Sequence, residues 1–170
     1  MLIIHPEKPA DIPSLRIVNQ LAFEQPQEVG LVDALRATNS ILLSLVAVLD
    51  EQIVGQALYT PVSIGLPPNP LIGAGLGPVA VLPAFQRQGI GSQLVTTGNQ
   101  MLQEAGYPFV VVLGHPTYYP RFGFQPASHF DIHCEWDVPD EAFMFKLLAP
   151  LKMTGISGLA SYRPEFSDVT

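Results

Sequence analysis

A nine-residue segment, QRQGIGSQL at positions 86–94, carries the residues best suited to holding a charged ligand. Its two glycines, Gly89 and Gly91, stand one residue apart between a polar run and an apolar-periodic run. Glycine makes a helix interior less stable, so a pair at a helix start indicates that something approaches the main chain closely. A turn that leads into a helix directs several N–H groups and the positive end of the helix dipole at one point. Phosphate suits this arrangement; glycines that merely permit tight helix packing are the alternative.

The common nucleotide motifs do not fit this segment. A dinucleotide fingerprint would need a third glycine at position 94, where the chain has Leu94, and a P-loop would need a Gly-Lys-Ser/Thr sequence, which is absent. Arg87 is the only charged residue from Gln52 to Gln103. Anion binding here must therefore come chiefly from main-chain N–H groups, at Gln88, Gly89, Gly91 and Ser92.

The chain offers no persuasive covalent nucleophile. Cys134 has no obvious base near it in the sequence, and the serines lack a nucleophile-elbow motif. As the single cysteine, Cys134 excludes an internal disulfide and any multi-cysteine metal site, and it fits a reducing compartment. We expect it to pack as an ordinary strand residue.

The charge balance favours a small cationic partner. The chain has 8 Lys and Arg against 15 Asp and Glu, a net charge of -7, which argues against binding nucleic acid or an anionic membrane. The acids form two clusters, Glu24, Glu28 and Asp33 in one, and Asp131, Glu135, Asp137, Asp140 and Glu141 in the other. Such clusters are either solvated faces or sites that hold a cation.

Length and composition predict one soluble domain. A chain of 170 residues that is 48% hydrophobic has the size of a single globular domain, residues 1–170. The N-terminus lacks a basic region followed by a long apolar run, and no stretch approaches the ~18 apolar residues of a membrane span. We therefore expect a cytoplasmic protein.

The first half of the chain predicts two helices and an antiparallel pair of strands. One helix opens at Ile12 with Asp11 as its cap, and a second follows the loop 23–27. The β-rich runs 42–49 and 53–63 flank a polar turn, which indicates an antiparallel pair.

The second half predicts a parallel crossover. Residues 76–82 form a buried strand interrupted at Gly77-Pro78, where proline cannot donate to a ladder and indicates a bulge or a splayed edge. A helical pattern over 91–105 then leads to Phe109–Leu113, a continuous apolar run typical of a buried strand. Strand, glycine turn, helix and strand make a parallel unit.

Later segments predict a short helix within 116–122, strands near 130–136 and 141–148, and one last strand in the tail. The fold class is α/β (α+β), with a mixed, mostly antiparallel sheet around one parallel pair.

Four segments together resemble a known superfamily. The residues Gln86-x-x-Gly89-x-Gly91 match the Arg/Gln-x-x-Gly-x-Gly/Ala acyl-CoA signature of the GCN5-related N-acetyltransferase (GNAT) superfamily. The segments LGPVAV at 76–81, YYPRFGF at 118–124 and VPDEAFM at 138–144 are similar to its YhbS-like N-acetyltransferases. The order of elements agrees over nearly the whole chain. The resemblance implies a GNAT-type sheet with one splayed parallel strand pair and helices on both faces.

The resemblance implies that acetyl-CoA is the ligand of the glycine turn, as acetyl donor and with no metal. Its pyrophosphate would lie on the turn, and its pantetheine arm would pair like an extra strand with the edge that Gly77-Pro78 opens. The implied coenzyme-binding residues are Val79, Ala80, Val81, Gln86, Arg87, Gln88, Gly89, Ile90, Gly91 and Ser92. The Val79 N–H would stabilise the oxyanion.

The catalytic residues follow less directly. The resemblance implies that Tyr119 is the proton donor to the leaving thiolate; the alternative is that Tyr119 packs in the core and Tyr118 or neither tyrosine is chemical. No acid lies on the interrupted strand, so a water chain or a carboxylate from elsewhere must accept the proton of the amine. Glu141 and Glu24 are the candidates, each expected to lie at the same cleft.

The resemblance implies an acyltransferase that moves an acetyl group to a primary amine by direct attack in a ternary complex. The acceptor would be a small amine, such as a polyamine or an amino-acid derivative, an antibiotic, or a peptide amine such as a protein N-terminus, and a homodimer is among the expected assemblies. A non-catalytic module that binds or senses acyl-CoA is the alternative from another class.

Overall fold

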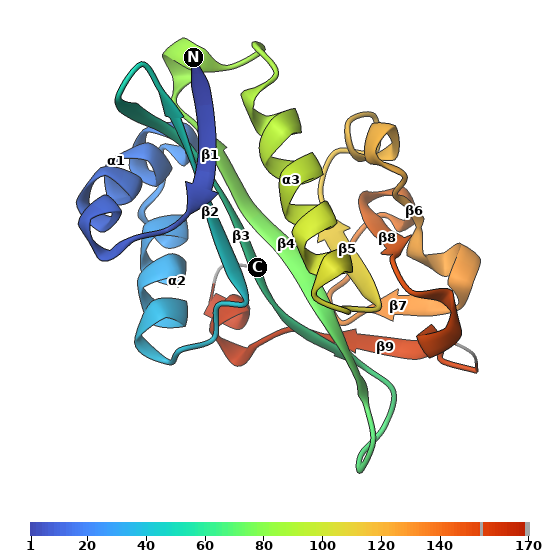
Figure 1. Ribbon diagram of the computed structural model, residues 1–170. Helices are drawn as coiled ribbons and strands as arrows, with labels where there is room; N and C mark the ends of the chain where they lie inside the picture. The colour runs from blue at the N-terminus through green and yellow to red at the C-terminus, as the bar shows by residue number, and fades with distance from the viewer. Residues whose placement is uncertain (154, 169–170) are drawn as a thin grey trace. The chain divides into compact units, whose positions relative to one another are not determined.

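The computed structural model describes residues 1–153 and 155–168, which fold into two compact units (Figure 1). The first unit contains residues 1–59 and 78–98 and the segment that begins at Pro164, and the second contains residues 60–77 and 99–163. Three elements have residues in both units: strands β3 (Gln52–Ile64) and β4 (Leu71–Val81), and helix α3 (Ile90–Glu104).

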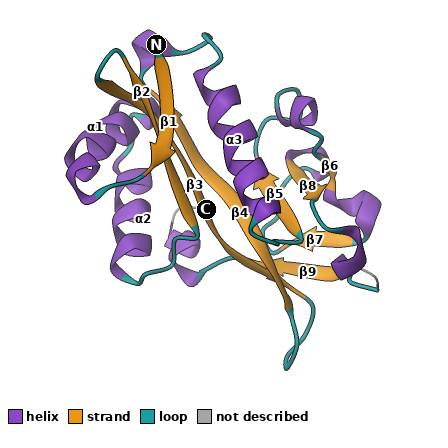
Figure 2. Ribbon diagram, in the orientation of Figure 1, coloured by secondary structure: helices purple, strands orange, loops and turns teal. Residues whose placement is uncertain are grey.

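The strands are joined in the order β1-β2-β3-β4-β5-β8-β6 (Figure 2). The remaining bounds are β1 (Leu2–Pro6), β2 (Leu43–Leu49), β5 (Phe109–Leu113), β6 (Gln125–Pro126) and β8 (Phe143–Leu147). Along this path β4 and β5 are parallel, whereas β1 with β2, β2 with β3, β5 with β8 and β6 with β8 are antiparallel, so the predicted fold class is confirmed. A second parallel contact, between β7 (Ile132–Cys134) and β9 (Gly158–Ser161), was not predicted.

Helices cover both faces of the strands in the first unit. Successive residues of a strand point to opposite faces. On β3, a Cβ at Gly55 would lie 3.2 Å from Leu94 of α3, whereas the side chain of Gln56 accepts a hydrogen bond from Asn19 at 2.7 Å. Asn19 belongs to α1 (Ile12–Phe23), which packs with α2 (Pro26–Ala37). The alternation on β3 therefore places α3 on one face and α1 on the other.

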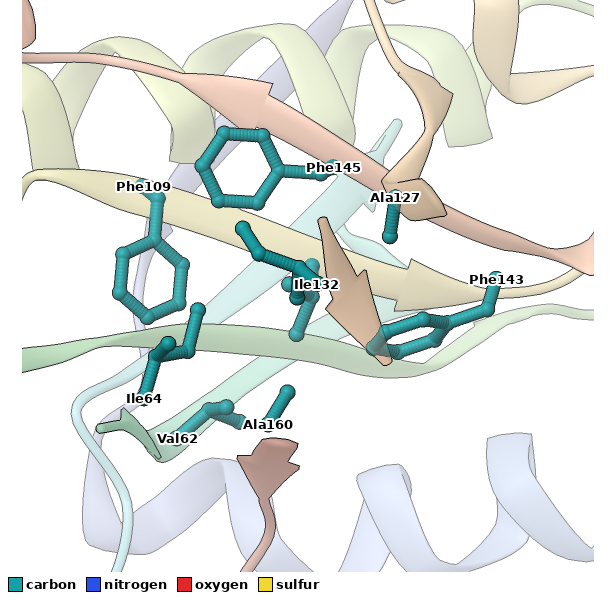
Figure 3. Packing of buried hydrophobic residues seen from close by; sticks show 9 residues of the cluster. Val62, Ile64, Phe109, Ala127, Ile132, Phe143, Phe145 and Ala160 are labelled. Atoms are coloured by element: carbon teal, nitrogen blue, oxygen red, sulfur yellow. The ribbon is translucent and has the colours of Figure 1, made fainter. Parts of the chain in front are cut away.

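The second unit has a core of aromatic and branched side chains (Figure 3). The rings of Phe109 and Phe145 stack with centroids 5.5 Å apart. The cluster consists of Val62, Ile64, Phe109, Val111, Ala127, Ile132, Phe143, Phe145 and Ala160. The first four residues of β5, Phe109–Val112, are all buried, so the prediction of a buried strand is confirmed.

One predicted boundary and one predicted contact differ from the structure. Asp11 occupies the N-cap position of α1, as predicted, but its side chain makes no capping bond there: it accepts the Lys8 N–H at 2.8 Å, across a 3-10 helix that precedes α1. Strand β4 begins at Leu71 rather than Leu76. It forms a long hairpin with its neighbour β3, and this hairpin extends the strand back to the residue after Pro70 (Figure 1). The 3-10 helices are η1 (Pro9–Asp11), η2 (Pro83–Phe85), η3 (Tyr119–Phe122), η4 (Ala127–Phe130), η5 (Asp140–Ala142), η6 (Pro150–Met153) and η7 (Pro164–Asp168).

Gly98 lets α3 pass closely over β3. A Cβ at position 98 would lie 2.5 Å from the hydroxyl oxygen of the buried Tyr59 and 2.7 Å from its Cζ. We expect Gly98→Ala to lower the free energy of unfolding by roughly 1 to 2 kcal/mol, because overpacking outweighs the helix propensity that alanine restores. Urea denaturation followed by circular dichroism measures this loss. Thr96→Ala, at an exposed position of the same helix, is the control, and equal stability of Gly98→Ala and wild type would contradict the contact.

Candidate active site

Strand β4 loses its parallel partner where the glycine and proline were expected to interrupt it. Its pairing with β5 runs from Ala74 to Leu76 and stops there. Gly77 has φ +146, a conformation that side chains rarely adopt, and Pro78 has no N–H to donate. Beyond this break lie the half-buried Val79 and Val81, with the buried Ala80 between them. This segment is the part of β4 for which a bound chain could supply hydrogen bonds.

The loop after η2 presents its backbone to solvent. Arg87 and Gly89 both have left-handed backbones, with φ +62 and +83, and residues 86–89 are exposed. The N–H groups of Gln88 and Gly89 donate to no described residue. In α3, Gln93 N–H donates to Gly89 O at 3.0 Å, so the N–H groups of Ile90 and Gly91 precede the first helical bond. The loop therefore presents a group of unsatisfied donors at a helix N-terminus, as an anion requires.

Glutamine side chains hold this loop. Gln86 Nε2 donates to Val81 O at 3.0 Å, which ties the loop to the end of β4, and Gln88 Nε2 donates to Ala84 O at 3.5 Å. Arg87 is exposed and has no ion-pair partner among the described residues. A Cβ at Gly89 would meet no atom within 4 Å, so the space beside its backbone is open.

Tyr119 belongs to the second unit and lies in an aromatic setting. Its ring meets Phe124 edge to face at 5.8 Å and Tyr118 at 5.0 Å. It also packs on the bare backbone of Gly114, where a Cβ would lie 3.1 Å from Tyr119 Cδ2. Burial, and secondarily the neighbouring Tyr118, raise the pKa of Tyr119 to about 12. Its hydroxyl has no hydrogen-bond partner among the described residues, so it is available to a ligand.

Arg121 braces the tyrosine segment. Its guanidinium Cζ lies 4.5 Å from the centroid of the Tyr118 ring, and its Nε donates to Tyr118 O at 2.8 Å. A cation over a ring face fixes the orientation of that ring. Arg121 therefore orders η3.

Glu141 lies in η5, the turn that supports Gly114. The N–H of Gly114 donates to Ala142 O at 2.9 Å, so this turn and the Gly114 contact of Tyr119 are neighbours in the second unit. The adjacent Asp140 accepts a hydrogen bond from Ser128 at 2.9 Å, whereas the Glu141 side chain is exposed. Unlike Asp140, Glu141 has no hydrogen-bond or ion-pair partner among the described residues.

Glu24 belongs to the first unit, where it ends α1. Its backbone is left-handed, with φ +56, and its N–H donates to Gln20 O at 3.1 Å. The Glu24 side chain lines a cavity of about 800 Å³ between α1 and α2. The sequence predicted neither the cavity nor Gly30, which also lines it. A lone glycine inside a helical pattern was the only signal in the sequence.

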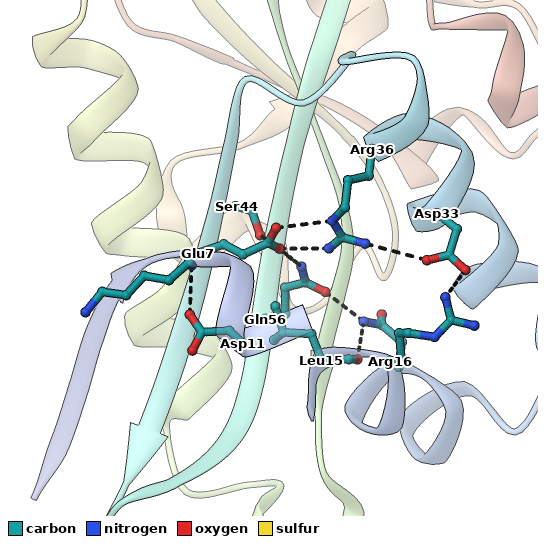
Figure 4. A network of polar contacts seen from close by, with 10 residues as sticks. Glu7, Asp11, Leu15, Arg16, Asp33, Arg36, Ser44 and Gln56 are labelled. Atoms are coloured by element: carbon teal, nitrogen blue, oxygen red, sulfur yellow. Dashed lines mark hydrogen bonds and ion pairs between the residues drawn. The ribbon is translucent and has the colours of Figure 1, made fainter. Parts of the chain in front are cut away.

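A polar network joins α1 and α2 to the strands (Figure 4). The carboxylate of Glu7 accepts from Arg36 Nη2 at 2.9 Å and from Ser44 Oγ at 2.9 Å. Asp33 of α2 pairs with Arg16 of α1, and its other oxygen lies 3.6 Å from Arg36. These bonds fix α1 and α2 to each other and to the strands.

Cys134 packs as an ordinary strand residue, as predicted. It lies on β7 against the core of the second unit, and burial raises the pKa of its half-buried thiol. Nearby, Trp136 meets the ring of Tyr162 at 5.0 Å. Within the described residues, no three His, Cys, Asp or Glu side chains form a group that could hold a metal, and no helix there is long and apolar enough to cross a membrane.

The structure places the predicted site residues in two groups. The predicted coenzyme-binding residues belong to the first unit, together with Glu24, while Tyr119 and Glu141 belong to the second. In the second unit, Gly114 links the two: Tyr119 packs on its backbone, and its N–H donates to Ala142 O next to Glu141.

Comparisons with known proteins agree with this geometry. Residues 4–127 match the family described as Acetyltransferase (GNAT) domain. The chain is 36% identical over 167 residues to the uncharacterized N-acetyltransferase YhbS of Escherichia coli K12, covering 98% of this chain and 99% of that protein. The crystal structure of Escherichia coli YhbS in complex with CoA matches with a TM-score of 0.93 over 99% of this chain and 93% of that one, at 36% identity. A GNAT family acetyltransferase from Brucella melitensis, in complex with acetyl-CoA, matches with a TM-score of 0.81 at 34% identity, over 98% of each chain.

Proposed function

Because this chain belongs to the GNAT acetyltransferase family, we propose that it transfers the acetyl group of acetyl-CoA directly to a primary amine within a ternary complex. The amine nitrogen attacks the thioester carbonyl carbon, the C–S bond breaks, and the products are an acetamide and free coenzyme A. The observation that carries the proposal is the loop 86–91, whose left-handed residues Arg87 and Gly89 expose main-chain donors ahead of α3.

In this proposal the first unit binds the coenzyme. The pyrophosphate accepts hydrogen bonds from the main chain of residues 88–92, and Gln86 holds the loop to β4. The pantetheine arm pairs with the main chain of Val79 and Val81, next to Ala80, beyond the break at Gly77. The Val79 N–H then stabilises the negative charge that develops on the carbonyl oxygen.

Tyr119 assists departure of the thiolate in this proposal. With a pKa of about 12, Tyr119 is a weaker acid than a thiol of pKa roughly 8.5, so full proton transfer would be uphill by roughly 5 kcal/mol. Tyr119 therefore donates a hydrogen bond to the sulfur in the transition state, and the thiolate gains its proton later from water. Glu141 or Glu24 accepts the proton that the amine loses.

The test combines binding with turnover. Calorimetry measures uptake of acetyl-CoA, and a thiol reagent measures coenzyme A release in the presence of primary amines. Acetyl-CoA uptake with amine-dependent thiol release supports the proposal. Uptake without release on any amine would favour an acyl-CoA sensor, and no uptake would contradict both functions.

The pH dependence of kcat tests the protonation state of Tyr119. The hydroxyl donates only while protonated, and burial moves its pKa upward to about 12, so donation is lost only as pH rises through that value. We expect kcat to rise with pH as the amine is deprotonated and to show no falling limb up to about pH 10. A falling limb centred near pH 10 in a chain that circular dichroism shows to be folded would contradict this assignment.

A further inference from the structure

The cavity between α1 and α2 has the size of a ligand site. Its volume of about 800 Å³ lies within the range of small-molecule pockets. Leu21, Pro26, Val29 and Pro83 supply apolar surface to its lining. Pro83 begins η2, three positions before Gln86, so the cavity adjoins the segment that leads into the coenzyme loop. Every lining residue belongs to the first unit.

The charges around the cavity leave one carboxylate unpaired. The ionisable lining residues are Arg16, Glu24 and Asp33. Arg16 and Asp33 form an ion pair with each other, and Asp33 lies 3.6 Å from Arg36 as well. Glu24 has no ion-pair partner among the described residues. The cavity therefore offers one free negative charge beside apolar walls, which is complementary to a monocation.

Gly30 keeps the cavity open at a cost to its helix. It lies in the interior of α2, where glycine is less favourable than any other residue but proline. No close packing requires it, because a Cβ built at position 30 would meet no atom within 4 Å. Since Gly30 lines the cavity, any side chain there would project into this open space.

Glu24 shows the opposite mismatch. At φ +56, glycine or asparagine is favoured, yet the chain has a glutamate. Position 24 therefore has a side chain where the backbone favours none, and position 30 lacks one where the helix favours one. Both mismatches occur at the same cavity, and residues held in unfavourable local conformations cluster at ligand sites.

We propose that this cavity binds the acceptor as an amphipathic primary monoamine, with its apolar body beside Gly30 and Val29 and its ammonium group on the Glu24 carboxylate. This inference rests on the proposed acetyl transfer and adds to it the class of the acceptor. A polyamine fits less well, because its second charge would face the apolar wall rather than a carboxylate.

The test uses 2-phenylethylamine as the probe, titrated into the whole chain and followed by the amide signals of Gly30 and Glu24 in NMR spectra. We expect these signals to shift on binding. Gly30→Leu should weaken Kd by roughly 10-fold or more by filling the space, and Glu24→Gln should weaken it by roughly 3- to 10-fold by removing an exposed charge-assisted hydrogen bond. Gly30→Ala should raise Tm by roughly 1 to 3 °C, because it restores helix propensity, while still weakening binding.

Matched controls separate the cavity from general effects. Gln27→Leu adds the same apolar side chain to α2 outside the lining. Glu51→Gln changes an exposed glutamate that also has a left-handed backbone, with φ +71. Both should leave the Kd of the probe nearly unchanged. Uncharged 2-phenylethanol should respond to Gly30→Leu but not to Glu24→Gln.

Two results would overturn the inference: no shift of the Gly30 and Glu24 signals with 2-phenylethylamine, or binding that neither variant weakens. The proposed acetyl transfer fails by a different measurement, the absence of acetyl-CoA uptake or of thiol release. If wild type acetylates amines and Gly30→Leu leaves their KM unchanged, only the acceptor site is wrong.

Discussion

Replacing Tyr119 by phenylalanine is expected to lower kcat by roughly 10²- to 10⁴-fold, the range that a positioned proton donor contributes. The hydroxyl is the only group removed, and no described residue hydrogen-bonds to it. The ring contacts with Phe124 and Gly114 are kept, so the fold should not change. Because the hydroxyl is proposed to act on the leaving sulfur in the transition state, the Kd of acetyl-CoA should stay within about two-fold of wild type. Thiol release and calorimetry measure the two quantities on the same samples.

Tyr118→Phe is the matched control for this experiment. Tyr118 is adjacent in the chain and its ring is covered by Arg121. If Tyr119 is the donor, Tyr118→Phe should retain most of the turnover. A large loss in Tyr118→Phe with little change in Tyr119→Phe would assign the chemistry to the other tyrosine. Unchanged turnover in both variants would remove this segment from the mechanism.

The second large effect is expected at the coenzyme loop. Gly89→Ala should weaken acetyl-CoA binding by roughly 10- to 100-fold, because a side chain at φ +83 is strained and would project where the ligand meets the backbone. Calorimetric titration with acetyl-CoA measures the change. Melting of the variant should show a small loss of stability, since the space around a Cβ at this position is otherwise open.

Gly106→Ala provides the comparison. Gly106 has a similar backbone, with φ +91, where α3 ends, far along the chain from the loop. It should lose stability to the same strain and keep the Kd of acetyl-CoA. Equal affinities of Gly89→Ala and wild type would show that the ligand does not approach residue 89.

The sequence predicted the parts of the site that are local in the chain. The spacing of Gly89 and Gly91 after Gln86 was sufficient to predict a turn that leads into a helix, because both arise from neighbouring residues. The apolar run Phe109–Leu113 was likewise sufficient to predict a buried strand. The break at Gly77-Pro78 was predictable because proline cannot donate and glycine adopts φ +146.

Other features depend on contacts between distant segments. The start of β4 at Leu71 depends on its pairing in a long hairpin with β3. The pKa of Tyr119 depends on burial by residues from other elements. The cavity between α1 and α2 needs the two helices at a fixed spacing, which the Arg16–Asp33 pair helps to set. The pattern of apolar residues in the sequence does not specify the distance between the two helices.

The single tryptophan of the chain makes the two compact units separable by spectroscopy. Trp136, packed on Tyr162, belongs to the second unit, so its emission reports local melting there, whereas far-ultraviolet ellipticity averages over the backbone of both units. Coincident curves for the two signals would mean that the units melt cooperatively as one. Separated curves would show which of the two units unfolds first, with Trp136 reporting on the second unit.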